Sequence, residues 1–296
     1  MPLEEIFFGF LISLSVCYFC RKRTLLRGIT LASVVAASAL GFAGKTALWL
    51  CLLVGLGTWL VLAAIAFAFL WIVCKKVDMD KPQEHDSKFY RTVMNIYIEA
   101  LRFLVGIRFS VTGAEKLPVE GRFMLVCNHL FLADPALILN AFPKAQLAFI
   151  TKQENLQMPI VGPIMHKIMC QSLDRDNDRS ALKTILKCIQ LLKDDEVSIG
   201  VFPEGYTSKD GMVHPFRAGV FKIAQKTGVP IVVCTIQNTR SIFKNLAKLK
   251  KTDVPLHLVD VIQPEEYAGK TTAEIGDMVY EMMIADLGEE FRYIEN

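Results

Sequence analysis

A histidine and an aspartate five residues apart, His129 and Asp134, are the two side chains best placed to do acid–base chemistry in this chain. An apolar, β-favouring run over residues 123–127 precedes them, and a second apolar run begins after Asp134-Pro135. This pattern predicts a strand, a loop and then a helix with Asp134 as its N-cap and Pro135 in its first position. His129 is therefore expected in the loop, ahead of the helix.

The loop decides whether the pair can meet. On a regular helix, residues five apart lie about 140° apart around the axis, too far for two short side chains to touch. A loop can bring the imidazole of His129 against the carboxylate of Asp134. The carboxylate would then fix the tautomer, and the other ring nitrogen could take a proton from a hydroxyl. The alternative is purely local: His129 packs or caps, and Asp134 only caps the helix.

Three more groups of residues follow in order along the chain. The first is Lys152 and Glu154, then Pro159 and Gly162, then Asp174-Arg175; the second is Phe202-Pro203-Glu204-Gly205 with Ser208; the third is Val229-Pro230-Ile231. With Asn128-His129 and Asp134, they resemble the four sequence blocks of the glycerolipid acyltransferase family, the lysophosphatidic acid acyltransferases and their relatives. The resemblance covers roughly residues 110–236, and four ordered blocks are far more specific than a lone HxxxxD motif.

This resemblance implies an enzyme that moves a fatty acyl group from a thioester, acyl-CoA or acyl carrier protein, to the free hydroxyl of a lysophospholipid. The implied acceptor is 1-acylglycerol-3-phosphate, which gives phosphatidic acid. His129 would be the general base, oriented by Asp134, without a covalent enzyme intermediate. Backbone N–H groups around His129 and Gly205 would stabilise the oxyanion. No cofactor and no metal are expected, and the five histidines are too scattered to suggest a zinc site.

The resemblance also implies which residues bind the acceptor. The family's acceptor-site carboxylate is matched by Glu204, which would orient glycerol hydroxyls or, alternatively, hold its own loop. Cations would bind the phosphate, and arginine suits it because its fork makes two parallel hydrogen bonds. The residues with an expected substrate-binding role are Lys152, Arg175, Glu204, Gly205 and Arg217. The alternative for each cation is an ordinary surface charge.

One departure from the family pattern concerns the acceptor. After Phe-Pro-Glu-Gly the family usually has Thr-Arg, and its arginine is assigned to the acceptor phosphate. This chain has Tyr206-Thr207 at these positions, which removes a charge-assisted contact worth roughly 1.5–3 kcal/mol. Either Lys209 or Arg217 replaces that cation, or the acceptor is another lysophospholipid or an amino lipid.

Two other functions compete with acyl transfer. A hydrolase of the α/β type needs a nucleophilic serine in G-x-S-x-G, and the chain has no such motif, since Ser208 lacks the flanking glycines. A non-catalytic, lipid-binding membrane protein that has kept the fold is harder to separate by sequence. The intact pair of His129 and Asp134 favours an enzyme.

The N-terminal quarter of the 296-residue chain is strongly apolar. Hydrophobic residues make up 52% of the sequence, the mean hydropathy is +0.36, and the excess lies before residue 75. Three apolar segments can be drawn there, at 6–20, 29–43 and 46–74. Only the last clearly exceeds the roughly 17 residues that a spanning helix needs. Residues 1–76 are therefore expected to be a membrane region with one to three transmembrane helices, and the bilayer is an expected partner.

Basic residues indicate the orientation of this region. Arg21, Lys22, Arg23 and Arg27 lie between the first two segments, and Lys75-Lys76 follow the third, whereas only Lys45 lies between the second and the third. Because basic loops stay in the cytoplasm, a three-helix arrangement places the N-terminus outside and the catalytic domain in the cytoplasm. A cleaved signal peptide is not expected, since Glu4-Glu5 stands where a basic region would be.

After a polar linker at 77–88, residues 89–296 alternate between strand-like and helix-like patterns. The expected strands are 108–112, 123–127, 147–151, 197–202, 230–236 and 256–262; the expected helices are 89–106, 182–192, 216–227 with Gly228 as its cap, and one from the capping box at 271–274. This order predicts an α/β domain with a mixed or mainly parallel sheet flanked by helices. The helix at 89–106 is expected to pack on this domain; the alternative is that it lies in the membrane interface.

Charge and cysteine content exclude other classes. The net charge of +3 is modest and no basic helix stands out, so nucleic acid is not expected as a partner. Eight cysteines show no metal-binding spacing beyond the apolar region, and a cytoplasmic domain is expected to hold them as thiols.

Overall fold

The computed structural model describes residues 24–42, 48–173 and 178–294. Its contacts divide the chain into two compact units, Met1–Val77 and Asp78–Asn296. The division falls one residue after the predicted end of the membrane region. Each unit is described separately below.

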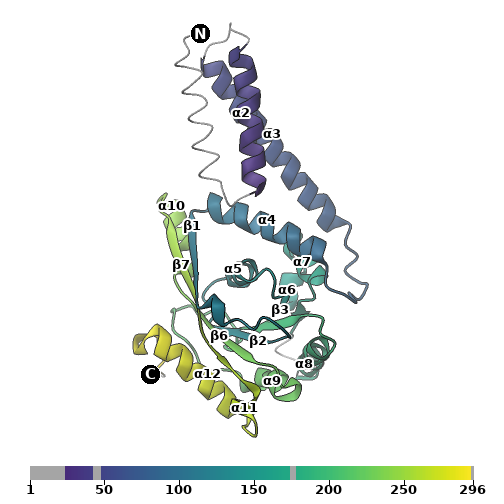
Figure 1. Cartoon of the computed structure of the whole chain (residues 1–296), viewed down its shortest axis with the longest axis vertical. Helices are drawn as coiled ribbons and strands as arrows, with labels where there is room; N and C mark the ends of the chain where they lie inside the picture. The colour runs from purple at the N-terminus through teal and green to yellow at the C-terminus, as the bar shows by residue number, and fades with distance from the viewer. Residues whose placement is uncertain (1–23, 43–47, 174–177, 295–296) are drawn as a thin grey trace. The chain divides into compact units, whose positions relative to one another are not determined.

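The first unit contains two helices in contact with each other, α2 (Thr24–Phe42) and α3 (Leu48–Lys75) (Figure 1). Within α3, the 23 residues Leu53–Lys75 have a mean hydropathy of 2.4, long and apolar enough to cross a membrane. The predicted segment 29–43 falls largely in α2, whose apolar stretch is shorter. The predicted segment 6–20 lies outside the described residues. One spanning helix is thus identified by length and composition in the described part of this unit.

The second unit is built on a seven-stranded sheet of order β1-β7-β6-β2-β5-β3-β4. The strands are β1 (Ile107–Thr112), β2 (Met124–Cys127), β3 (Leu147–Thr151), β4 (Gln171–Ser172), β5 (Ser198–Val201), β6 (Ile231–Ile236) and β7 (Thr252–Ile262). Only β6 and β7 pair antiparallel; every other pair is parallel. The predicted mixed sheet is confirmed. Its central strands β2, β5 and β6 are buried along their whole length, as expected for parallel strands covered on both faces.

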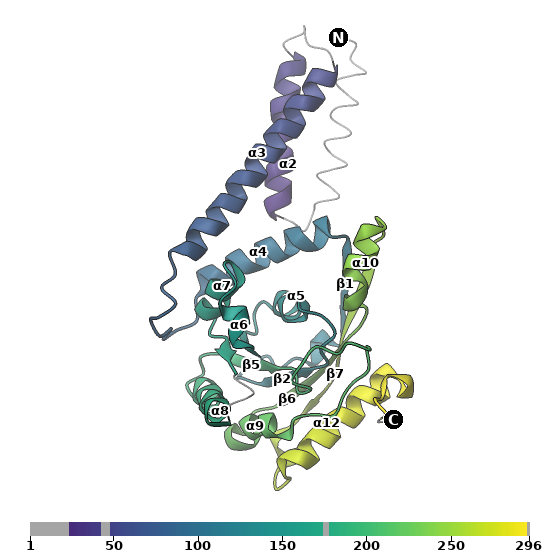
Figure 2. The same cartoon turned by 180° about the vertical axis from the view of Figure 1, so that it is seen from behind.

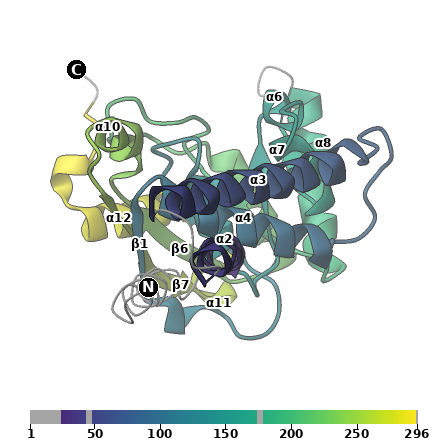
Figure 3. The same cartoon turned by 90° about the horizontal axis from the view of Figure 1, so that it is seen from above.

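Helices cover both faces of this sheet. On one face lie α4 (Lys88–Leu104) and α5 (Asp134–Ala141), with α6 (Gln153–Leu156) and α7 (Val161–Lys167) beside them; on the other lie α8 (Asp178–Lys193), α9 (Lys222–Thr227) and α12 (Thr272–Leu287) (Figures 1 and 2). The short helices α10 (Ile242–Ala247) and α11 (Pro264–Tyr267) flank β7. Figure 3 shows α10 on the β1 side of the domain, away from α6 and α7.

Two predicted helix boundaries are confirmed by their caps. Gly228 closes α9 in the left-handed conformation, and Thr271 with Glu274 forms a capping box at the start of α12. The helix α4 packs against α5, α7 and β1, with Val93 and Met94 buried, so its predicted packing on the domain is confirmed.

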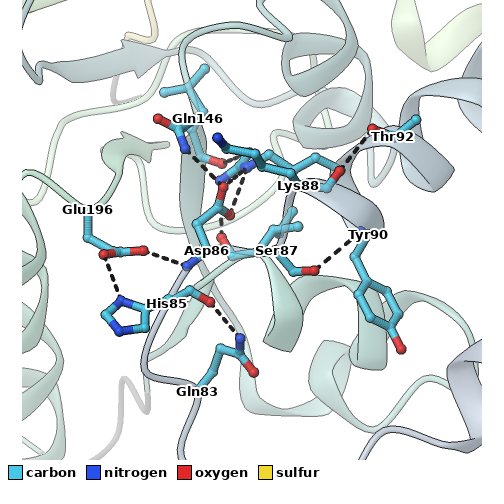
Figure 4. A network of polar contacts seen from close by, with 12 residues as sticks. Gln83, His85, Asp86, Ser87, Lys88, Tyr90, Thr92, Gln146 and Glu196 are labelled. Atoms are coloured by element: carbon cyan, nitrogen blue, oxygen red, sulfur yellow. Dashed lines mark hydrogen bonds and ion pairs between the residues drawn. The ribbon is translucent and has the colours of Figure 1, made fainter.

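The residues before α4 are fastened to the domain rather than loose. Figure 4 shows Glu196, just after α8, accepting a hydrogen bond from the backbone N–H of Asp86. The carboxylate of Asp86 accepts a hydrogen bond from the Gln146 amide at 3.2 Å and pairs with the buried guanidinium of Arg91 at 2.7 Å. The second half of the predicted linker at 77–88 is therefore part of the packed unit.

Candidate active site

The predicted site residues gather where parallel strands end. The loop with His129 follows β2, the loop with Glu204 follows its neighbour β5, and Lys152 follows β3. Because these strands run parallel, their carboxyl ends lie along one edge of the sheet. This edge is where open α/β sheets bind ligands.

The structure brings His129 and Asp134 together, as their spacing predicted. Nδ1 of His129 lies 3.0 Å from Oδ2 of Asp134. Asp134 is fully buried, whereas 14% of the His129 side chain is exposed. A carboxylate at Nδ1 makes this nitrogen the N–H donor and leaves Nε2 as the acceptor. The ring is thus set to accept a proton from a group at Nε2.

The predicted helix start is wrong by one residue. Ala133 is the N-cap of α5, Asp134 is its first residue and Pro135 its second. The carboxylate does not cap α5, because it turns back to the preceding loop. Its Oδ2 accepts the backbone N–H groups of Leu130 and Phe131, both at 2.7 Å. Three donors on one oxygen fix the loop and the imidazole together.

Two aromatic rings support the imidazole. The Phe202 ring stacks on His129 with 4.1 Å between ring centroids and 20° between planes. Phe149 stacks on the far side of Phe202 at 5.1 Å. Phe149 in turn occupies the space above Gly200, where a Cβ would lie 2.6 Å from the ring. Glycine in β5 is therefore required for this column of three rings.

Glu204 ties the two loops together. Its side chain is buried; Oε1 accepts the backbone N–H of His129 at 2.9 Å and Oε2 that of His214 at 3.1 Å. The backbone N–H of Ser208 donates to the His129 carbonyl at 2.8 Å and completes the link. Burial raises the pKa of Glu204 to about 7, against the lowering effect of the two backbone donors. This geometry favours the loop-holding alternative for Glu204 over direct contact with an acceptor.

The oxyanion donors expected in the loops around His129 and Gly205 stay a prediction, although the N–H groups of these two residues are themselves occupied. The backbone N–H of His129 already donates to Glu204, and that of Gly205 donates to the Phe202 carbonyl at 3.0 Å. Both are used within the loops because the turn after β5 closes on itself.

Gly205 serves instead to seat an arginine. It has a φ of +83°, which favours glycine. A Cβ at this position would lie 2.8 Å from Cδ and Nε of Arg217. The backbone N–H of Arg217 donates to the Pro203 carbonyl at 2.9 Å. The guanidinium stem therefore lies over the Phe-Pro-Glu-Gly turn, and Arg217 is an exposed cation at the site.

The other predicted cations differ in their placement. Lys152 is exposed between β3 and α6, and no hydrogen bond or ion pair joins its side chain to the His129 loop in the part of the chain that the structure describes. Arg175 and its neighbour Asp174 lie outside the described residues. Lys209 is exposed, and its carbonyl accepts a hydrogen bond from Arg240. Arg240 is thus a cation beside the site that the sequence patterns did not single out.

Further residues that hold the site were also not predicted. Asn128 is buried and joins the ends of β2 and β6 through two hydrogen bonds with Ile236; its place next to His129 in the motif was the available signal. At the other end of the Glu204 loop, Val213 pairs with the C-terminal segment at Arg292, and the ring of Tyr293 lies 4.2 Å from that of His214. No local pattern marks this long-range contact.

The arrangement defines a class of protein: an α/β domain in which a histidine oriented by a carboxylate is placed to accept a proton. Among the described residues, no group of three or more His, Cys, Asp or Glu side chains is placed to hold a metal ion. Proton transfer by His129 is the chemistry that these side chains can do.

Comparisons with known proteins show what the chain is similar to. Residues 108–237 match the family model described as Acyltransferase. The chain is 29% identical to a 1-acyl-sn-glycerol-3-phosphate acyltransferase of Borreliella burgdorferi, over 62% of this chain and 74% of that protein. It is 32% identical to a chloroplastic 1-acyl-sn-glycerol-3-phosphate acyltransferase of Brassica napus, over 52% of this chain and 45% of that protein.

A solved structure agrees with these relatives. The crystal structure of the 1-acyl-sn-glycerophosphate acyltransferase PlsC from Thermotoga maritima is similar with a TM-score of 0.58 and 25% identity, over 78% of this chain and 91% of that chain. In sequence and fold the chain is thus similar to the glycerolipid acyltransferase family, and these relatives are named as acyltransferases of 1-acyl-sn-glycerol-3-phosphate or 1-acyl-sn-glycerophosphate.

Proposed function

We propose that this protein transfers a fatty acyl group from a thioester to the free hydroxyl of 1-acylglycerol-3-phosphate and so forms phosphatidic acid. The observation that carries the proposal is the contact between His129 and the buried carboxylate of Asp134. The names of the relatives supply the reaction and the acceptor. Acyl-CoA and acyl carrier protein both remain candidate donors.

The proposed reaction uses one proton shuttle. Nε2 of His129 removes the proton of the acceptor hydroxyl as its oxygen attacks the thioester carbonyl carbon. A tetrahedral intermediate forms and then collapses with cleavage of the C–S bond. The thiolate takes the proton from the imidazolium and leaves as a free thiol. Asp134 stabilises the imidazolium in between and keeps the ring in the productive tautomer.

Arg217 is the proposed phosphate contact. Its stem lies over Gly205, one residue before Tyr206-Thr207, where the usual arginine of the family is missing. A guanidinium from the N-cap of the following 3₁₀ turn, Ala218–Phe221, can supply the same two hydrogen bonds. A different lysophospholipid or an amino lipid is the competing acceptor, because the Tyr206-Thr207 departure is the feature in which this chain differs from its family.

Membrane attachment fits this function. The spanning candidate within α3 would hold the protein where both the acceptor and the product reside. With Lys75 and Lys76 after this helix, the catalytic domain is proposed to face the cytoplasm. The acceptor then arrives within the leaflet, and the acyl donor arrives from water.

The test is acyl transfer by the purified full chain in detergent. Palmitoyl and oleoyl thioesters of CoA and of acyl carrier protein are offered with a panel of lysophospholipids, and His129→Ala is the control. Acylation of 1-acylglycerol-3-phosphate that the folded variant fails to perform supports the proposal. Preference for another lysophospholipid would overturn 1-acylglycerol-3-phosphate as the acceptor and leave acyl transfer in place. Absence of transfer from both donors favours a non-catalytic lipid-binding protein of the same fold.

A further inference from the structure

A short segment next to the site combines exposed cations with exposed apolar side chains. Residues 240–251, here named the basic tip, comprise a 3₁₀ turn, α10 and the following turn. The tip has five exposed cations and no acidic residue: Arg240, Lys244, Lys248, Lys250 and Lys251. Two of its apolar side chains face solvent, Phe243 at 63% exposure and Leu249 at 95%. Because the cations are spread over two turns and a six-residue helix, they form no basic helix in the sequence.

The tip is an ordered turn rather than a loose loop. The carbonyl of Asn245 accepts the backbone N–H groups of Lys248 at 3.0 Å and of Lys250 at 2.8 Å. The side chain of Asn245 is anchored on the hydroxyl of Thr252 at 3.1 Å. Leu249 is held at a φ of +53°, a conformation that is unfavourable for leucine. An ordered turn that holds a leucine exposed in a strained conformation indicates that the side chain inserts into a binding partner.

The tip lies at the active edge of the sheet. It connects the carboxyl end of β6 to the start of β7, and β6 is the neighbour of β2, which carries the His129 loop. The ring of Phe131 in that loop packs edge-on against Phe243 with centroids 5.3 Å apart. The next residue, Leu132, is 58% exposed. Exposed apolar side chains thus extend from the tip to the loop that holds the general base.

We propose that the basic tip docks on the surface of a bilayer that contains anionic lipids, with Phe243 and Leu249 in the interface and the cations at the headgroups. Aromatic and leucine side chains among lysines are the composition that binds such interfaces. Each lysine near an anionic surface adds to the attraction, which salt screens. Docking would hold the His129 loop against the leaflet independently of α3. An acidic protein is the less suitable partner, because a side chain 95% exposed on a turn fits a fluid interface better than a flat polar surface.

The test measures the depth of the tip in vesicles without any turnover. A bimane label is attached to Phe243→Cys or Leu249→Cys in the full chain, with Val119→Cys as the matched control. Val119 is 96% exposed and lies before β2, at the opposite edge of the sheet. Cys17, Cys20, Cys51 and Cys74 are changed to serine. The four cysteines of the domain, Cys127, Cys170, Cys188 and Cys234, are buried and have raised thiol pKa values because of burial, so they react slowly.

Quenching by nitroxide on lipid acyl chains is compared in vesicles of phosphatidylcholine alone and of phosphatidylcholine with phosphatidylglycerol. We expect the labels at 243 and 249, and not at 119, to be quenched in the anionic vesicles. Changing Lys244, Lys248, Lys250 and Lys251 to glutamine should weaken docking by roughly 10²–10³-fold. The same charge change at Lys183, Lys187, Lys193 and Lys226, exposed on α8 and α9, should leave it unchanged.

Three results would overturn the proposal. The first is equal quenching at 243, 249 and 119; the second is quenching that ignores both the anionic lipid and the glutamine variant. The third is protection of the labels from aqueous iodide by apo acyl carrier protein, a soluble acidic protein, beyond that given by anionic vesicles. The measurement needs no substrate, so failure of the acyl transfer assay leaves its result intact, and the reverse also holds.

Discussion

The ring of Phe202 stacks on that of His129 at 4.1 Å, so the residue that opens the Phe-Pro-Glu-Gly block supports the imidazole of the first block. The two blocks are 73 residues apart in sequence and meet because β2 and β5 are parallel neighbours. The stack restrains the imidazole plane while Asp134 fixes its rotation from the edge. Together they leave the ring little freedom in the direction that proton transfer requires.

We expect Phe202→Leu to lower kcat by about two- to tenfold, because a stacked pair contributes about 0.5–1.5 kcal/mol beyond its buried area. The loss should appear in kcat and not in the KM for acceptor. Phe216→Leu is the control, since its ring packs on Tyr280 instead. Steady-state kinetics on both variants check this. Equal rates for Phe202→Leu and the native chain would show that Asp134 alone orients the ring.

Gly200→Ala should disturb the stack of the His129, Phe202 and Phe149 rings at its Phe149 end. The new methyl would meet the Phe149 ring at 2.6 Å, and overpacking of this kind costs about 1–3 kcal/mol. We expect a lower Tm and a lower rate, since Phe149 supports Phe202. The double variant Gly200→Ala with Phe149→Leu should recover part of the lost Tm and part of the lost rate. If the second substitution only adds to the damage, the clash is not the cause.

Asp134→Asn tests the role of the carboxylate in catalysis. An amide cannot stabilise the imidazolium and offers an N–H where Oδ2 now accepts three donors, so the rate should fall by about 10²–10⁴-fold. Asp210→Asn is the control; that carboxylate contacts His214 and Ser208 rather than His129. Scanning fluorimetry of both variants separates misfolding from lost chemistry. A folded Asp134→Asn protein with more than a tenth of the native rate would contradict the mechanism.

Local patterns were sufficient to predict the strand–loop–helix unit of residues 123–139 and the meeting of His129 with Asp134. They gave Asp134 the role of helix cap, because a sequence does not show that loop N–H groups compete for the carboxylate. The alternation of buried and exposed residues in β7 begins at Thr252, four residues before the predicted start. Residues 252–255 form a strand only because β1 pairs with them.

Long-range contacts could not be predicted from the sequence either, because local patterns do not show which distant segments meet. Tyr293 has no periodic pattern around it, and it meets His214 only because the C-terminal segment returns to Val213 after α12. Glu204 could be read as an acceptor ligand or as a loop residue, and only its burial between two backbone N–H groups separates the two roles.

The raised pKa of Glu204 gives a pH dependence with a definite sign. Its folded pKa is about 7, against 4.5 for the ordinary group, so between these values the folded chain holds a proton that the unfolded chain has released. The stabilisation is therefore complete below pH 4.5 and is lost as the pH rises through 7. Asp210, whose burial is outweighed by hydrogen bonds from Met212 and Ser208, has a pKa of about 2 and does not titrate in this window.

We therefore expect the stability of the native chain, relative to Glu204→Gln, to fall between pH 5 and 7 by at most about 1.4 kcal/mol per pH unit. The glutamine stays neutral and provides the reference. Apparent Tm values of both proteins in the same detergent, measured across this range, check the slope. A constant difference between the two proteins would mean that Glu204 keeps one charge state throughout.

Arg217→Ala tests which cation replaces the arginine that is missing after the Phe-Pro-Glu-Gly block. A charge-assisted hydrogen bond contributes about 1.5–3 kcal/mol, so its loss should raise the KM for 1-acylglycerol-3-phosphate by about 10- to 100-fold and leave the KM for the thioester unchanged. Arg217→Lys should recover only part of this, because an ammonium lacks the two-pronged fork. Lys222→Ala, a change of the same charge on the exposed start of α9, should have little effect. If Arg217→Ala and Lys222→Ala behave alike, the guanidinium over Gly205 does not bind phosphate. Arg240, which reaches the carbonyl of Lys209 from the other side of the loop, is then the cation to change next.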